Sequence, residues 1–410
     1  MAPNQQLKMG FGEFVVLAAA MMSTQALAVD AMLPALPTIV AEMHVADENH
    51  GQWIIHLYVA GVGLGQFFWG LMSDRYGRRP VLLSGLGLYV LAAVSCALAT
   101  SFPALLAWRL LHGLAAASVV VTRSVIRDLY SGRPMARIMS LTFVVFIMVP
   151  IIAPSIGQAM LALAPWRFVF VLFAAFGGSV WLWAMLRLKE TLHPEYRLTL
   201  TGRHVWGAVK IVLGDRTSLY YSLAVMVMIG SLLAYVGMVQ QIFADVFRRA
   251  SLMPTMFALC AMSMGAAAIV NSRIVERLGM RRISHAALLA FIGVTATHFV
   301  VAALGFEQIW TFVVLQSATM ACFSLAVSNF GAMALEPVGA VAGIGASLQG
   351  FMTMTGGALI ALLIGWQFNG TTVPLAGGAL ICGILSLLFV LRAERWRLFR
   401  PHHAPAGQAA

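Results

Sequence analysis

Three polar side chains lie well inside long apolar runs of this 410-residue chain, where a charge needs a partner. Asp30 lies about seven residues, roughly 10 Å, before its run ends, and Arg109 and His56 lie at a similar distance from the start of theirs. Because the three share one depth, we expect them to face one another. A carboxyl group that alternates between an arginine and a proton can couple proton movement to another process. The alternative is a static Asp30–Arg109 ion pair that fixes helix packing.

The elements that position these residues follow from the composition. Hydrophobic residues make up 60% of the chain and charged residues 10%, against about a quarter in soluble domains, and the mean hydropathy is +0.87. A hydrocarbon core needs about 20 apolar residues per helical crossing. The apolar runs therefore predict an all-α polytopic membrane protein with twelve transmembrane helices, over 11–37, 51–73, 80–100, 103–128, 137–163, 166–187, 216–245, 251–275, 282–304, 308–335, 340–366 and 372–393.

The positive charges gather on alternate connections between these runs. That group comprises Lys8, Arg75, Arg78, Arg79, Arg133, Arg137, Arg187, Lys189, Arg197, Arg203, Lys210, Arg273, Arg277, Arg281, Arg282, Arg392, Arg395, Arg397 and Arg400. The other connections hold Arg167, Arg248 and Arg249. Positive residues concentrate on the cytoplasmic side of membranes, so we expect both termini in the cytoplasm. This placement explains the net charge of +11 without nucleic acid as a partner.

The remaining reactive groups argue against an enzyme and against a metal centre. The four cysteines, Cys96, Cys260, Cys322 and Cys382, all lie inside apolar runs without paired spacing, so we expect no disulfide, no metal site and no cofactor. The sequence contains no nucleophile elbow and no phosphate-binding loop.

A short charged loop, GLMSDRYGRRP, joins the second and third runs. The charged residues of interest lie in this loop or at the end of the fourth run: Asp74, Arg75, Arg78, Arg79 and Asp128. Carboxylates on both sides of an arginine form charge-assisted hydrogen bonds that exist in one packing of the helices. We therefore expect a conformational latch. The alternative is that the arginines only hold the loop in the cytoplasm.

A similar pattern returns in the second half of the chain. NSRIVERLGMRR (271–282) keeps the order of DRYGRR, with Met280 inserted. We therefore predict a six-helix bundle over 1–188, a cytoplasmic linker over 189–215, and a second six-helix bundle with a short cytoplasmic tail over 216–410.

The linker has its own pattern. Arg203, His204 and Lys210 alternate with apolar residues at roughly helical spacing, which favours an amphipathic helix on the membrane surface. A solvated linker is the alternative.

The charged loop resembles the one between helices 2 and 3 of the major facilitator superfamily of transporters. This resemblance implies two half-repeats about an axis along the membrane normal, with the substrate site between them near mid-membrane. It also implies that Asp74, Arg78 and Asp128 latch the outward-facing state.

The resemblance is narrower in the first half. DAMLPALPTI (30–39), SDRYGRRP, RLLHGLAAASVVVTRSVIRDLY (109–130) and APSIG are similar to the Bcr/CflA drug-resistance branch of the drug:proton antiporters. Two residues depart from the related sequences. Met22 stands where some relatives have a second acid, and His112 stands where many have glutamine.

The fifth run carries Pro150, Pro154 and Gly157, where exporters of this superfamily have their antiporter motif. The prolines remove backbone donors and bend a helix, and the glycine permits close approach of a neighbour. Gln158 replaces the usual second glycine.

The substrate surface is expected on the helices that line the central cavity of such a fold. The candidates are Met22, Tyr58, His112, Tyr235, Met238, Gln241, Asn329, Met333 and Gln349. Methionine adapts to varied shapes, although packing is the alternative for each candidate. His298 has no charged neighbour in its run, so we expect a structural role for it.

These features predict a proton-coupled antiporter that exports amphiphilic small molecules, such as antibiotics, by alternating access in the bacterial inner (cytoplasmic) membrane. Its partners are a small-molecule substrate, protons and the lipid bilayer, with no nucleic acid, and we expect a monomer. One alternative exports a metabolite or siderophore with the same machinery. Another is an uncoupled facilitator or a transporter-like receptor.

Overall fold

The computed structural model describes residues 9–116, 118–130, 132–193, 195 and 202–399, and the regular elements in these residues are all helical. The first half contains α1 (Phe11–Asp30), α2 (Leu36–Glu42), α3 (Trp53–Tyr76), α4 (Arg78–Ala97), α5 (Phe102–Leu114), α6 (Ser118–Leu129), α7 (Gly132–Leu163) and α8 (Arg167–Arg187). The second contains α10 (Arg216–Gln241), α11 (Met253–Leu278), α12 (Met280–Ala303), α13 (Ile309–Leu335), α14 (Ala342–Phe351), α15 (Gly357–Gly365) and α16 (Val373–Ala393). Helix α9 (Gly202–Gly214) lies between them in the sequence.

Twelve membrane-spanning segments are present in the described residues, as predicted. Eleven are long and apolar enough to cross a membrane, by length and composition. The twelfth is α7, a 32-residue helix with prolines at 150 and 154. The protein is therefore a multi-pass membrane protein with the predicted all-α fold.

Several spans contain short interruptions where the apolar runs predicted continuous helices, although the outer bounds of these spans lie near the predicted ones. The first span passes from α1 through the 3₁₀ turn η2 (Leu33–Ala35) into α2, and the fourth is divided into α5 and α6. The π-helical turn η5 (Ile242–Val246) follows α10, and a second π-helical turn, η8 (Met352–Gly356), separates α14 from α15. Such interruptions free backbone groups inside the membrane region, so they have to be stabilised by neighbouring segments.

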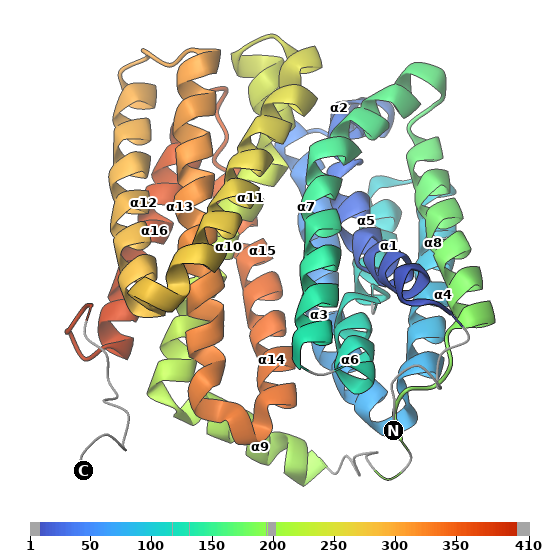
Figure 1. Ribbon diagram of the computed structural model, residues 1–410. Helices are drawn as coiled ribbons and strands as arrows, with labels where there is room; N and C mark the ends of the chain where they lie inside the picture. The colour runs from blue at the N-terminus through green and yellow to red at the C-terminus, as the bar shows by residue number, and fades with distance from the viewer. Residues whose placement is uncertain (1–8, 117, 131, 194, 196–201, 400–410) are drawn as a thin grey trace.

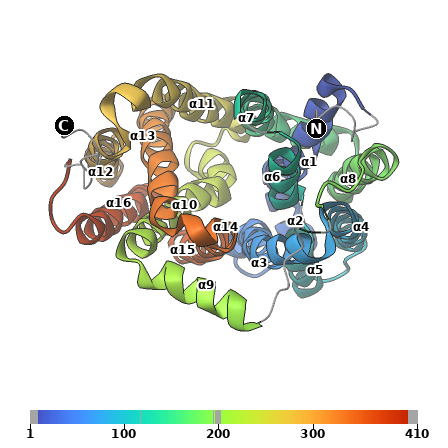
Figure 2. The same ribbon diagram turned by 60° about the horizontal axis from the view of Figure 1, so that its bottom comes forward.

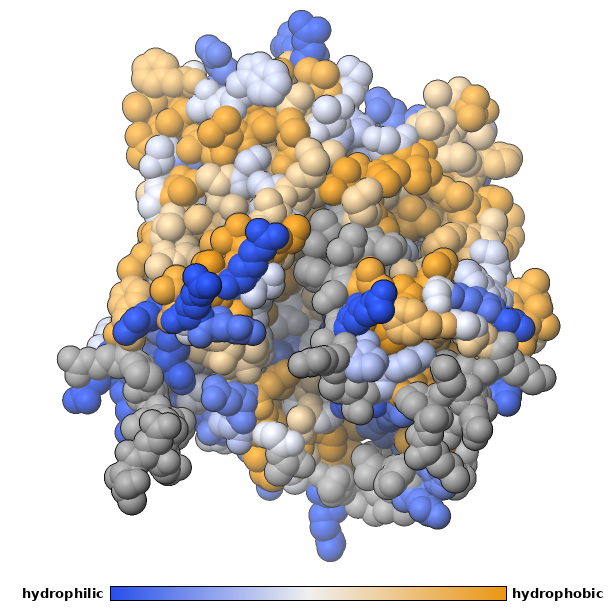
Figure 3. All heavy atoms as spheres, in the orientation of Figure 1, coloured by the Kyte–Doolittle hydropathy of each residue, from blue (hydrophilic) through white to orange (hydrophobic). Residues whose placement is uncertain are grey.

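Figures 1 and 2 show α1–α8 gathered on one side of the molecule and α10–α16 on the other. Helix α2 lies at the top of Figure 1 and α9 crosses the bottom, so the two ends of the bundle are named here the α2 end and the α9 end. On the face seen in Figure 3, apolar side chains cover most of the upper half below some hydrophilic side chains at the top edge, and more hydrophilic side chains gather toward the α9 end.

The repeated sequence motif has a repeated backbone geometry. Gly77 (φ 105°, ψ 158°) precedes α4, and Gly279 (φ 79°, ψ 149°) precedes α12. Both glycines have positive φ, which residues with a Cβ rarely adopt. The turn after α3 and the turn after α11 therefore require glycine at the same place in the motif.

Helix α9 lies across the α9 end (Figure 2), and its apolar residues belong to a cluster with members from both halves. Its residues Ala208, Val209 and Val212 form one apolar cluster with residues of the second half (Val338, Ile344, Leu348) and of α3 (Phe67, Leu71). Trp206 and Ile211 are exposed, at 59% and 54%. Residues 194 and 196–201 of the predicted linker, and the side chain of His204, lie outside what the structure describes.

Candidate functional site

Asp30 is the last residue of α1, at the point where the first span is broken. Pro34 and Pro37 follow it, and each lacks a backbone donor, so the α-helix stops and resumes only at Leu36. The Asp30 side chain is 5% exposed. Its carboxylate has no hydrogen bond or ion pair with any described residue. A buried carboxylate at the broken end of a membrane helix is a typical position for a coupling-ion or substrate site.

Arg109 does not pair with Asp30, so the predicted direct contact is not formed in this structure. The guanidinium donates from Nε to the carbonyl of Ile54 (3.0 Å) and from Nη2 to the carbonyl of Ala28 (3.1 Å). Its Nη1 lies 3.3 Å from Nδ1 of His112. Ala28 belongs to the last turn of α1, where carbonyls lack helical partners. Arg109 thus binds the backbone next to Asp30 rather than its carboxylate.

Two predicted substrate residues belong to the surroundings of Arg109. The guanidinium carbon lies 4.3 Å from the ring centroid of Tyr58, and the His112 ring lies 4.1 Å from the ring of Tyr89. The hydroxyls of both tyrosines donate to carbonyls of α1. We name Arg109, His112, Tyr58 and Tyr89 the Arg109 cluster. It is fully buried and connects α1, α3, α4 and α5.

The break between α5 and α6 follows this cluster directly. The indole N–H of Trp69 donates to the carbonyl of Leu114, the last residue of α5, at 2.6 Å. Ser118 at the start of α6 shares a 2.8 Å hydrogen bond with Thr24 of α1. Side chains of α3 and α1 therefore satisfy groups on both sides of the break.

His56 faces the second half of the molecule rather than Asp30. Its Nδ1 lies 2.8 Å from the carbonyl of Gln52 and its Nε2 lies 3.2 Å from the carbonyl of Leu233 on α10. Carbonyls only accept hydrogen bonds, so both contacts are hydrogen bonds only when both ring nitrogens carry protons. Asp30, Arg109 and His56, which were predicted to face one another, therefore do not bind one another in this structure.

The two halves are joined near the α2 end by a group of amides. Gln52 donates to Oε1 of Gln241 (2.5 Å), and Gln241 donates to Oδ1 of Asn49 (3.1 Å). Asn49 and Gln52 also donate to the carbonyls of Phe368 and Gly365, at 3.0 and 3.4 Å. We name Asn49, Gln52 and Gln241 the amide lock. The predicted substrate residue Gln241 is part of it.

The charged loop forms the predicted cluster around Arg78. Its guanidinium donates to Asp128 Oδ2 (2.8 Å), to Ser73 Oγ (2.9 Å) and to Asp74. Arg78 is only 3% exposed. All these partners belong to the first half. The approach to the second half is through Asp74, whose Oδ2 lies about 4 Å from where a Cβ of Gly343 on α14 would be.

The other two loop arginines lie outside this set of contacts. Arg79 donates to the carbonyl of Met185 (2.8 Å), and the Arg75 guanidinium lies 5.1 Å from the ring of Tyr76.

Glu190, which follows α8, contacts this loop, and the sequence analysis did not identify it. Its carboxylate accepts from the backbone N–H of Arg78 (2.8 Å) and Arg79 (3.2 Å), the first residues of α4. It also accepts from the N–H groups of Thr191 and Leu192. A carboxylate at a helix N-terminus satisfies donors that have no helical partner. Its position in the repeat could have identified it. Glu190 follows the sixth apolar run as Glu394 follows the twelfth, and Glu394 binds Arg281 of the second motif at 2.8 Å.

The predicted antiporter segment packs directly behind Asp30. Pro150 and Pro154 both lie inside α7. A Cβ on Gly157 would overlap the carbonyl of Ala31, the residue after Asp30. Gln158 is exposed, so it does not enter this contact. The glycine permits α7 to reach the broken end of α1.

The remaining substrate candidates have packing or hydrogen-bond partners within the protein, or are buried. Tyr235 stacks on Phe257 at 5.7 Å, Asn329 donates to Asn271 (2.9 Å), and Gln349 donates to the carbonyl of Gly331 at 3.4 Å. The methionine candidates are all buried: Met22, Met238 and Met333. Their roles stay predictions.

The sequence analysis found no charged neighbour for His298 within its apolar run, but the structure provides one from outside that run. His298 does have a charged neighbour, because its Nε2 lies 2.6 Å from Oε1 of Glu307. Glu307 also accepts from the hydroxyl of Thr372. Glu307 lies in the connection after α12, which the apolar run alone did not place against the histidine.

Comparisons with known proteins agree with the helical fold of the chain. The sequence profile of the Major Facilitator Superfamily matches residues 14–361. The chain is 29% identical over 377 residues to the uncharacterized MFS-type transporter YdgK of Bacillus subtilis (strain 168), covering 90% of this chain and 92% of YdgK. It is 32% identical over 179 residues to the multidrug resistance protein MdtL of Escherichia coli (strain SMS-3-5 / SECEC). That match covers 43% of this chain and 46% of MdtL, about half of the relative.

A solved structure has the same fold. The crystal structure of the human organic anion transporter MFSD10 (TETRAN) superposes with a TM-score of 0.64, covering 95% of this chain and 100% of that chain. The sequence identity is 20%, so this likeness concerns the fold alone.

Proposed function

This chain belongs to the Major Facilitator Superfamily, and we propose that within it the protein is a proton-coupled exporter of amphiphilic small molecules. It exchanges protons for substrate by alternating access, with the α9 end in the cytoplasm of a bacterial cell and the α2 end on the outer side of the inner membrane. The positive charges support this orientation, because positive residues concentrate on the cytoplasmic side of a membrane. The matching turns after Gly77 and Gly279 carry such residues, Arg78 and Arg281 among them.

The observation that carries the proposal is the state of Asp30. A carboxylate that is 5% exposed and has no hydrogen bond or ion pair with the described residues is free to bind a proton or a cation. Arg109 holds the backbone beside it through the carbonyl of Ala28. A movement of α1 therefore changes the surroundings of the acid and of the arginine together.

His56 supports a second titration step between the halves. Protonation of its ring completes hydrogen bonds to both Gln52 and Leu233, which lie on opposite halves. The proton on His56 then favours the packing in which α3 and α10 are close. The name of MdtL, a multidrug resistance protein similar to part of this chain, supports a drug-like substrate.

The test of the proposal uses two steps. A bacterial strain without its own exporters, expressing this protein, is screened against a panel of antibiotics to identify a substrate. Purified protein is then placed in proteoliposomes, and uptake of that substrate is measured with an imposed pH gradient. Asp30→Asn removes the titratable group and keeps its shape, so we expect gradient-driven uptake to disappear while membrane insertion is normal.

The matched control is Glu276→Gln, which removes an exposed carboxylate near the end of α11 and should keep gradient-driven uptake. Full gradient-driven uptake by Asp30→Asn would rule out Asp30 as the coupling site.

A further inference from the structure

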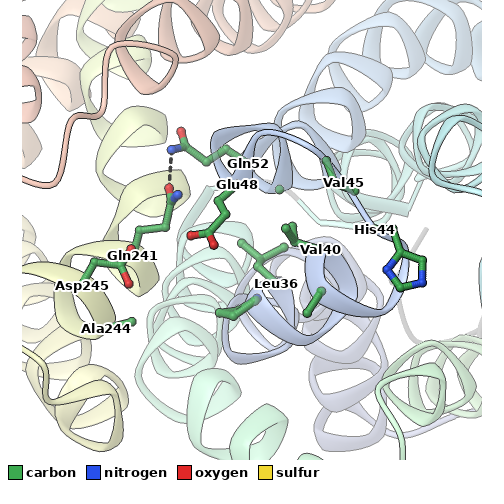
Figure 4. Close-up of a pocket in the computed structure, with 12 residues that line it drawn as sticks. Leu36, Val40, His44, Val45, Glu48, Gln52, Gln241, Ala244 and Asp245 are labelled. Atoms are coloured by element: carbon green, nitrogen blue, oxygen red, sulfur yellow. Dashed lines mark hydrogen bonds between the residues drawn. The ribbon is translucent and has the colours of Figure 1, made fainter.

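A cavity of about 420 Å³ opens at the α2 end, between the two halves. One wall is apolar and comes from α2 and the turn before it, with Leu36, Val40 and Ala41. The opposite wall comes from the end of α10 and from η5 (Figure 4). The amide pair Gln52–Gln241, drawn as a dashed line in Figure 4, also lines the cavity.

Two carboxylates from opposite halves line this cavity, Glu48 and Asp245. Both line the same cavity, and the carboxylate of Glu48 points across it toward the segment of Gln241 and Asp245 (Figure 4). Neither forms an ion pair with a described residue. His44, a lining residue whose ring lies on the far side of Figure 4, is turned away from them.

Other acids of the α2 end have cationic or imidazole neighbours. Glu42 pairs with Arg167, Asp47 lies 3.9 Å from the ring of His50, and Glu307 lies 2.6 Å from His298. The two acids that line the cavity lack such a neighbour among the described residues, although the net charge of the chain is +11. Repulsion between them is relieved when a positive group lies in the cavity.

The position of the acids relates the cavity to the amide lock. Glu48 lies about one helical turn before Gln52, and Asp245 lies about one turn after Gln241. Separation of Gln52 from Gln241 therefore also separates the carboxylates. The π-helical turn that carries Asp245 is of a kind often found at functional sites.

We propose that this cavity binds an amphipathic organic cation, with its positive group between Glu48 and Asp245 and its apolar part against Leu36, Val40 and Ala41. As the place where a cationic substrate pauses outside the amide lock, the site rests on the proposed export function. Its binding chemistry does not, because the cavity and its charges are present whatever drives the transport.

The test measures binding without transport. Purified full-length protein in detergent is titrated with tetraphenylphosphonium, an amphipathic cation, and with triphenylphosphine oxide, a neutral molecule of similar shape. Glu48→Gln with Asp245→Asn should weaken tetraphenylphosphonium binding about tenfold, the effect of two partly screened charges. The same pair of changes should leave triphenylphosphine oxide binding unaltered.

Two further variants separate the cavity from general charge effects. Glu276→Gln with Glu336→Gln removes the same charge at the opposite end of the molecule and should keep the affinity for tetraphenylphosphonium. Ala41 is an exposed residue that lines the cavity, so Ala41→Phe places a large side chain in it and keeps both carboxylates. This variant should weaken binding of both probes.

The site and the export function fail in different ways. An unchanged dissociation constant in the Glu48→Gln, Asp245→Asn variant overturns the site. Loss of tetraphenylphosphonium binding in Asp30→Asn also overturns the site, because it would show that the cation binds near Asp30 inside the membrane and not in this cavity. Loss of gradient-driven transport in Asp30→Asn, with tetraphenylphosphonium binding intact, leaves the site in place.

Discussion

A buried guanidinium needs several acceptors, and Arg109 obtains them from backbone carbonyls and an imidazole. Its depth was readable from the sequence, because the apolar run around it is long. The direction of its side chain was not readable, because depth along a helix says nothing of rotation about the helix axis. Asp30 and Arg109 were predicted to touch for this reason, and in the structure the arginine binds Ala28 and Ile54 instead.

Arg109→Lys tests whether this geometry matters. A lysine keeps the charge but cannot reach three separate acceptors in the directions of a planar guanidinium. Each lost charged hydrogen bond is worth about 1.5–3 kcal/mol, so we expect a lower unfolding temperature in detergent and a sharp fall in transport. The control is Arg127→Lys, an exposed arginine on α6, which should behave like the parent protein. Normal transport by Arg109→Lys, with an unchanged pH profile, would contradict the argument.

At the scale of elements, the number of spans was predictable and their interruptions were not. Run length alone shows how many helices cross the membrane, because each crossing needs a similar length. Pro34 and Pro37 signalled the break after Asp30, but an apolar run with proline also describes a kinked helix. The break after Leu114 has no proline. The carbonyl of Leu114 accepts from the indole of Trp69, 45 residues earlier in the chain, and no local pattern reveals this contact.

Gly157→Ala tests the contact between α7 and the broken first span. The added methyl group overlaps the carbonyl of Ala31, so one of the two segments has to move. Overpacking of this kind costs about 1–3 kcal/mol, and we expect lower thermal stability together with reduced transport. Gly293→Ala on α12 is the matched control, because its Cβ meets no atom within 4 Å. Equal stability of the two variants would show that the contact is unimportant.

Glu190→Gln tests the carboxylate that caps α4. Glutamine has one acceptor oxygen in place of two, and its amide group would face N–H donors that it cannot accept from. Loss of a helix cap costs about 0.5–2 kcal/mol, so the unfolding temperature should fall and the loop of Arg78 should become more sensitive to proteolysis. Glu195→Gln, at an exposed acid of the same connection, is the control. If both variants resist protease equally, Glu190 does not order the loop.

At the scale of the whole molecule, the hydrogen bonds between the halves that involve described residues all come from residues 49–60 of the first half. The sequence predicted two halves and a charged loop between α3 and α4, and the Arg78 cluster is present there. Its hydrogen-bond partners all lie within one half, so the cluster does not join the two halves by hydrogen bonds. Asn49 and Gln52 do so, and these amides lie in a connection with no recognisable motif.

The amide lock makes a prediction about access from the α2 end. In a background without the four native cysteines, Ser231→Cys places a reporter on α10 at a site that is 2% exposed. Gln52→Ala with Gln241→Ala removes the direct bond between the halves. Neutral hydrogen bonds contribute about 0.5–1.5 kcal/mol, so labelling of the reporter by an impermeant maleimide added outside the cell should become about five- to tenfold faster.

The control for this experiment is Gln367→Ala, since that exposed amide, in the turn after α15, donates to the nearby carbonyl of Leu363. It should label at the parent rate. A parent rate in the double variant would show that packing, rather than the amides, closes this end.

Helix α9 has a consequence for how the bilayer enters the transport cycle. Its apolar residues belong to one cluster with Ile344 and Leu348 of one half and Phe67 and Leu71 of the other, so separation of the halves at that end divides this cluster. We expect the surface released there to face headgroups and acyl chains, because the exposed side of α9 carries Trp206 and Ile211. The free energy difference between the open and closed states therefore contains a solvation term that the lipid supplies. Acyl-chain length and headgroup packing then act on the resting conformation in the same way as a mutation, with no change in the protein.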